Sequence, residues 1–72
     1  MNLQEVLKGV RASELPYCAK PYFMAMLSMD SVDDQYGFDS GREIVLRFLC
    51  NVGTWRGETA RRVKKQLKEL LK

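Results

Sequence analysis

The chain has 72 residues, of which 46% are hydrophobic and 29% are charged, and its formal net charge is +3. This length and composition predict one folded domain spanning residues 1–72, and they exclude a disordered chain or a protein with a large core. The longest apolar run, residues 21–27, is far shorter than the ~20 residues that cross a bilayer. No signal-peptide pattern opens the chain, so we expect a cytoplasmic protein without membrane contact.

Charged residues are divided unequally between the two parts of the chain. Residues 1–39 contain three basic and six acidic side chains, a net charge of −3, whereas residues 40–72 contain nine basic and three acidic ones, a net charge of +6. This asymmetry favours an electrostatic partner. Contact between the two parts, or head-to-tail association of two copies, would use the same charges.

A short helix is predicted at the start of the chain. Asn2 followed by Glu5 is a capping pattern, and Gly9 should end the helix. Its apolar face would be formed by Leu3, Val6, Leu7 and Val10. Residues 13–16 then predict a break, because the residue before Pro16 is biased away from helical backbone angles.

The next segment, Tyr22 to Met29, is almost entirely apolar and follows Pro21, which suits a first helical turn. Its methionines, alanine and leucine favour a helix, and a buried strand is the alternative. Filling the core is the simplest role for the methionines. Met24 and Met26 would otherwise form an adaptable binding surface or the interface of a homodimer.

Residues 30–39 form an acidic connector. Ser31 and Asp34 predict a single helical turn that Gly37 would end. The carboxylates suggest calcium, but the EF-hand pattern fails, because Gln35 stands where glycine is required and Gly41 where glutamate is required.

A central apolar helix is predicted from Gly41 to Val52. Ser40 and Glu43 form a capping box at its start. Its polar stripe is narrow and consists of Glu43, Arg47 and Asn51. A helix with so wide an apolar face should be covered by more than one neighbour.

A tight corner should join this helix to a C-terminal one. Gly53 is predicted to take a left-handed conformation, Thr54 to cap the next helix, and Trp55 to close the end of the core. Because Gly57 weakens the first turn, the last helix should properly begin at Glu58 and extend to about Leu71. Its apolar stripe, which should pack on the central helix, is Ala60, Val63, Leu67, Leu70 and Leu71.

Most of the positive charge gathers on one flank of this last helix, beside Arg62, Gln66 and Glu69 on the other side. We name this flank, with the corner arginine, the basic ridge: Arg56, Arg61, Lys64, Lys65, Lys68 and Lys72. A ridge of this kind suits the phosphates of a nucleic acid or an acidic protein surface. An ordinary solvated helix face is the alternative interpretation.

Several chemistries are missing from the sequence. It contains no histidine, which removes the commonest general base and zinc ligand. Cys18 and Cys50 are isolated, so we expect reduced, mostly buried thiols without a catalytic role. No glycine-rich phosphate loop occurs. We therefore expect a protein that is not an enzyme and holds no metal or cofactor.

Taken together, these patterns predict an all-α fold, a small compact bundle of three to four helices with a central apolar helix and a basic C-terminal helix. The leading hypothesis is a regulatory or accessory module whose basic ridge contacts nucleic-acid phosphates without reading bases. A helix-turn-helix reader is less favoured, because the lysines lie toward the far end of the last helix. The alternatives are a protein-interaction module, such as a phage- or plasmid-type inhibitor or adaptor docking on an acidic protein or nucleoprotein surface, and self-association.

Overall fold

The computed structural model describes residues 2–72, and within them the fold is mostly helical, with 59% of the chain in helices. Four α-helices, two 3₁₀ turns and one two-stranded sheet follow one another in this part of the chain. Their bounds are α1 (Leu3–Leu7), η1 (Ala12–Glu14), η2 (Tyr17–Ala19), α2 (Lys20–Leu27), β1 (Gln35–Tyr36), β2 (Asp39–Ser40), α3 (Gly41–Cys50) and α4 (Glu58–Leu70). The mostly helical fold that the sequence predicts is confirmed, and the small sheet is an addition to it.

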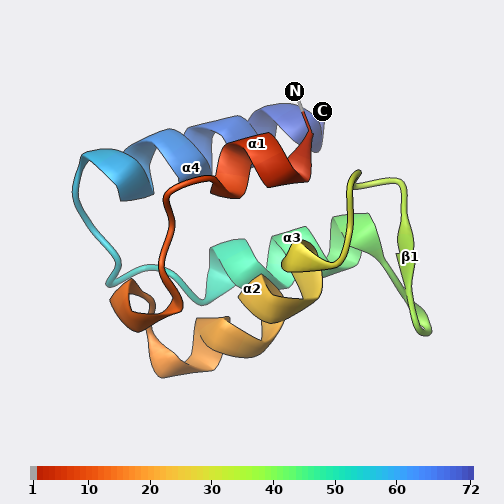
Figure 1. Cartoon of the computed structure of the whole chain (residues 1–72), viewed down its shortest axis with the longest axis horizontal. Helices are drawn as coiled ribbons and strands as arrows, with labels where there is room; N and C mark the ends of the chain where they lie inside the picture. The colour runs from red at the N-terminus through yellow and green to blue at the C-terminus, as the bar shows by residue number, and fades with distance from the viewer. Residues whose placement is uncertain (1) are drawn as a thin grey trace.

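The helices form two layers (Figure 1). In one layer α1 lies alongside α4, and in the other α2 packs against α3. The apolar stripe of α4 belongs to the same core cluster as the buried residues of α3, and α1 is the helix that lies closest to α4. No helix within residues 2–72 combines the length and the apolar composition needed to cross a membrane.

A continuous apolar core lies between the two layers. Trp55 is buried at one end of this core, as predicted. Its ring packs edge-to-face against the ring of Phe48, with the ring centroids 6.3 Å apart. The largest side chains with almost no exposure are Phe48, Leu3, Met26, Leu67, Val6, Val45, Val52 and Val63.

The predicted helix in the apolar segment 22–29 is confirmed as α2, with Pro21 in its first turn. Of its two central methionines, Met26 is buried in the core whereas Met24 is 58% exposed. Met29, the third methionine of the segment, is also buried (2% exposed), so the core-filling role holds for Met26 and Met29 but not for Met24.

The C-terminal end of α2 is capped by a side chain from the first helix. The amide nitrogen of Gln4 donates hydrogen bonds to the carbonyl oxygens of Leu27 (2.9 Å) and Met29 (2.8 Å), with a longer contact to Met26 (3.5 Å). The Met26 carbonyl also accepts from Met29 N–H (3.1 Å), whereas carbonyls at the end of a helix, such as that of Leu27, lack the following N–H groups of a continued helix. One side chain thus links the two helical layers.

Replacing Gln4 with alanine should lower the free energy of unfolding by about 1 kcal/mol, because the carbonyls of Leu27 and Met29 lose their side-chain donor. Urea unfolding followed by circular dichroism measures the change. Gln35→Ala is the matched control, since Gln35 is exposed and its side chain makes no hydrogen bond within residues 2–72. Equal stability of the two variants would show that the Gln4 contacts contribute nothing.

The acidic connector contains a turn followed by a hairpin. The predicted turn is confirmed, because Asp34 N–H donates to Ser31 O (3.1 Å) and the Asp34 carboxylate accepts from the Asp30 and Ser31 N–H groups (2.9 and 3.2 Å). Gly37 does not end that turn. It has a φ of 61° in the two-residue loop that joins the antiparallel strands β1 and β2.

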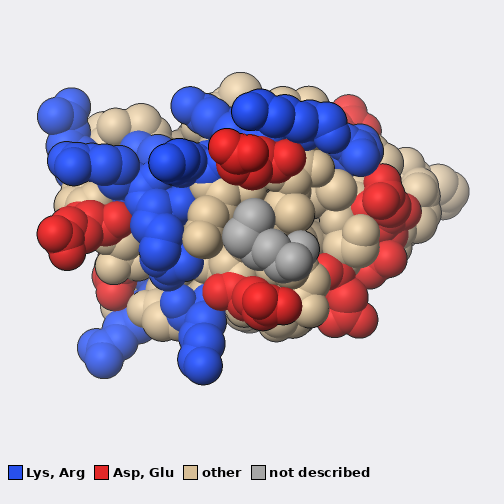
Figure 2. Space-filling model, turned by 90° about the horizontal axis from the view of Figure 1, so that it is seen from above, with Lys and Arg blue, Asp and Glu red and all other residues tan. Residues whose placement is uncertain are grey.

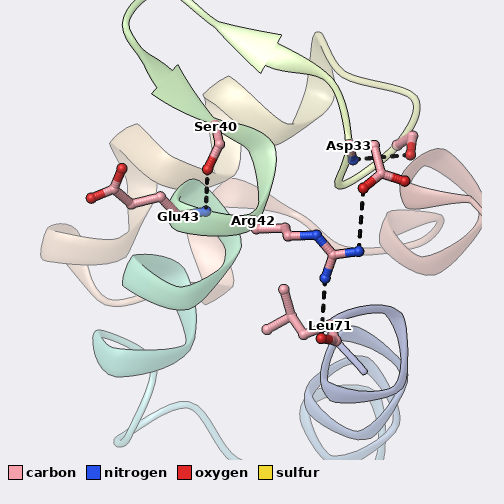
Figure 3. A network of polar contacts seen from close by, with 6 residues as sticks. Asp33, Ser40, Arg42, Glu43 and Leu71 are labelled. Carbon is pink, nitrogen blue, oxygen red and sulfur yellow. Dashed lines mark hydrogen bonds and ion pairs between the residues drawn. The ribbon is translucent and has the colours of Figure 1, made fainter.

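At the start of α3, one of the two hydrogen bonds of the predicted capping box is present. Ser40 Oγ accepts from Glu43 N–H (3.2 Å), as predicted (Figure 3). The Glu43 carboxylate instead accepts from Arg47 (2.9 Å), four residues later. The helix ends at Cys50, two residues before the predicted boundary.

The corner between α3 and α4 differs from the prediction. Gly53 has no positive φ, and the left-handed residue is Gly57, with a φ of 115° at the N-cap of α4. Thr54 therefore does not cap the helix, which begins at Glu58 as expected. The predicted apolar stripe of α4 is confirmed, with Ala60, Val63 and Leu67 buried.

Candidate functional site

Charge is segregated on the face that carries α1 and α4 (Figure 2). Lysine and arginine side chains form a band along the upper edge and the left part of this view, with a few carboxylates among them. Acidic side chains gather at the right-hand end. The charge asymmetry of the sequence is therefore also a spatial asymmetry on this face.

Three members of the basic ridge meet at the corner before α4. Arg56, Arg61 and Lys64 line an open hollow of about 320 Å³ together with Trp55 and Gly57. Gly57 provides no side-chain acceptor for the first N–H groups of α4, so the positive end of the helix dipole adds to these cations. Such an arrangement attracts anions.

Lys64 also has a structural role. Its Nζ donates to the carbonyl oxygen of Trp55 at 2.8 Å, and the residue is half-buried. This bond fixes the corner segment against α4. Lys64 is therefore less available to contact a ligand than the sequence pattern suggested.

The remaining three residues of the basic ridge occupy the rest of the exposed flank of α4 and its C-terminal end. Lys65 lies beside Arg61 on the surface of α4, whereas Lys68 and Lys72 line a groove between α4 and α3. Lys72 pairs with Glu69 (3.7 Å). Within residues 2–72 no ion pair is formed by Arg56, Arg61, Lys65 or Lys68.

Arg62 lines one surface hollow with Arg61 and Lys65, but its guanidinium is occupied by structural contacts. Its guanidinium donates to the carbonyl oxygens of Val6 (3.2 Å) and Lys8 (3.3 Å) and to Gln66 Oε1 (2.9 Å). It therefore caps the C-terminal end of α1 from the neighbouring helix. The sequence does not reveal this role, because the partners lie more than fifty residues away.

Arg42 joins three segments at the opposite end of the molecule (Figure 3). Its guanidinium donates to the Asp33 carboxylate (3.2 Å) and to the carbonyl oxygen of Leu71 (3.1 Å). It thus links the acidic connector, α3 and the end of α4. Both of its partners are protein groups, so we assign it to the fold and not to the candidate site.

The two thiols are unpaired, and both residues are exposed, which corrects the expectation of mostly buried cysteines. The Cys18 thiol donates a weak hydrogen bond to Asn51 O at 3.6 Å. Among residues 2–72, no three cysteine, aspartate or glutamate side chains converge as a metal site would require.

Comparison with models of protein families, with curated protein sequences and with solved structures finds no match for this chain. A proposal about its function therefore depends on its own surface chemistry.

Proposed function

We propose that this protein is a non-enzymatic helical-bundle module with a regulatory or accessory role, which binds the phosphate backbone of nucleic acid through the basic ridge. The observation that supports this most is the exposed flank of α4, where Arg61, Lys65 and Lys68 have no acidic partner within residues 2–72. Cations left without a protein partner gain most from phosphate contact and from the release of counterions.

The spacing of these side chains suits a linear polyanion. Seven residues separate Arg61 from Lys68, a distance of about 10 Å along the helix axis at 1.5 Å per residue. A duplex of that length carries about six phosphate charges, at one per 1.7 Å. The ridge can therefore meet several phosphates at once.

Contact with phosphates is favoured over reading of bases. In a helix-turn-helix protein the first residues of the second helix contact base edges. Here Trp55 is buried and the helix opens with Gly57 and Glu58. A carboxylate and a glycine at that end provide few donors for bases, so binding should depend little on nucleotide sequence.

A triple variant, Arg61→Ala, Lys65→Ala and Lys68→Ala, tests the proposal. If each side chain contacts one phosphate, the slope of log affinity against log salt should become shallower by about 2.7 for duplex DNA. Between 50 and 200 mM salt the unmodified protein should then lose about 40-fold more affinity than the variant. Fluorescence anisotropy with unrelated duplexes and single strands measures this directly.

The matched control removes the same number of charges elsewhere. Lys8, Arg11 and Lys20 are the three basic residues of residues 1–39. Changing them to alanine should leave the slope of log affinity against log salt largely unchanged. Equal effects of the two triple variants, or no binding by the unmodified protein at low salt, would contradict the proposal. The second result would direct attention to an acidic protein surface as the partner.

A further inference from the structure

The tip of the β1–β2 hairpin presents an aromatic side chain without any contact. Phe38 is 105% exposed and Tyr36 is 46% exposed. The tip is held in place by strand pairing and by the left-handed conformation of Gly37. A fully exposed aromatic group is costly in water and is typical of a residue that anchors an interface. Asp39 follows it directly and adds negative charge.

A groove between α3 and the end of α4 has the complementary character. Its volume is about 360 Å³, and its walls are mostly apolar. Leu46, which the wide apolar face of α3 leaves 52% exposed, lies in one wall. The residues that line the groove are Leu46, Leu49, Cys50, Lys68, Leu71 and Lys72.

We infer that the occupant of this groove is the hairpin tip of a second copy of the chain. Phe38 of one copy enters the apolar groove of the other, and Asp39 then lies near Lys68 and Lys72. The full exposure of Phe38 shows that the tip does not fill the groove of its own chain. The acidic hairpin and the cationic groove have opposite charge, which favours this pairing over tip-to-tip contact.

The two surfaces are different, so the contact is head-to-tail in kind. One aromatic side chain and its neighbours bury far less than the ~1,600 Å² of a stable interface, which makes the association weak. The groove shares Lys68 and Lys72 with the basic ridge, so nucleic acid would compete for these two cations, whereas Phe38 and Leu46 lie outside the ridge and test the association alone.

Sedimentation equilibrium without nucleic acid, from about 10 µM to about 1 mM protein, should show a mass that rises with concentration. Phe38→Ser and Leu46→Glu should each weaken association about thirtyfold or more, as the loss of an anchor does. Tyr17→Ser is the matched control, since Tyr17 is 88% exposed but lies on another segment. It should associate like the unmodified protein.

Mixing the two defective variants gives the decisive result. Phe38→Ser retains an intact groove and Leu46→Glu retains an intact tip, so an equimolar mixture should form a heterodimer although neither variant associates alone. A mixture that stays monomeric would overturn the inference. Self-association of one variant alone would overturn it too, because tip-to-tip contact predicts it for Leu46→Glu and groove-to-groove contact predicts it for Phe38→Ser. A concentration-independent monomer for the unmodified protein would overturn it as well. Circular dichroism confirms that each variant remains folded.

Discussion

Replacing Phe48 with alanine is expected to lower the free energy of unfolding by about 3–5 kcal/mol. Phe48 has no exposed surface, and its ring contacts Trp55 at the end of the core. The change removes the buried apolar area and leaves a cavity that neighbouring helices fill only in part. Because a chain of 72 residues has a small core and a modest total stability, most of that stability would be lost.

Urea unfolding measures this loss, with the fluorescence of the single tryptophan, Trp55, as a local probe beside circular dichroism. Leu46→Ala in the same helix is the control, since that side chain is half-exposed and should cost less than about 1 kcal/mol. Both unfolding curves are recorded at low protein concentration. If Phe48→Ala is no less stable than Leu46→Ala, the core is not organised around Phe48.

Replacing Gly41 with alanine is expected to destabilise the protein by about 2 kcal/mol, although alanine is the better helix former. An added Cβ would lie 2.7 Å from the carbonyl oxygen of Val32 and 2.9 Å from that of Asp34. Both are backbone atoms, so the turn in the acidic connector must move. That movement would also disturb the hydrogen bond from Gly41 N–H to Asp34 O, at 2.7 Å.

Gly53→Ala provides the matched comparison for Gly41→Ala. No atom lies within 4 Å of a Cβ at Gly53, and its φ is not positive. Alanine there should be neutral or stabilising by up to about 1 kcal/mol, because it restricts the unfolded chain. Thermal unfolding of both variants gives the comparison. Equal melting temperatures would show that the close approach at Gly41 carries no cost.

Features that depend on neighbours in the sequence were predictable. The Asn2 cap is present, with the Glu5 N–H donating to its side chain (2.9 Å), and Ser40 caps α3. The start of α4 at Glu58 follows from the weak helix propensity of Gly57. In each case the interacting groups are within a few residues, so the sequence alone determines the local conformation.

The hairpin and the corner were not predictable on the same basis. Two strands of two residues each are too short for a periodic pattern. Gly53 and Gly57 are both able to adopt left-handed angles, and the structure has the positive φ at Gly57. Only the packed structure resolves such alternatives.

The sequence predicted which residues belong to the candidate site, but not which of their side chains already bind other groups of the protein. Helical periodicity places Arg61, Lys65 and Lys68 on one flank, whereas the structure puts Arg62 in the same surface hollow as Arg61 and Lys65 and distinguishes it by its contacts with α1. Periodicity does not show that Lys64 donates to a backbone carbonyl of the corner. Side chains of this length reach partners that no pattern in the sequence specifies.

The pairing of α1 with α4 has a consequence for the order in which the fold is completed. A helix of five residues is not stable alone in water, and the carbonyl oxygens of Val6 and Lys8 receive their side-chain donor from Arg62. These contacts join residues more than fifty positions apart. Closing so long a loop is slow compared with forming the more local contacts between α2 and α3. We therefore expect α1, although it comes first in the sequence, to be among the last elements to fold.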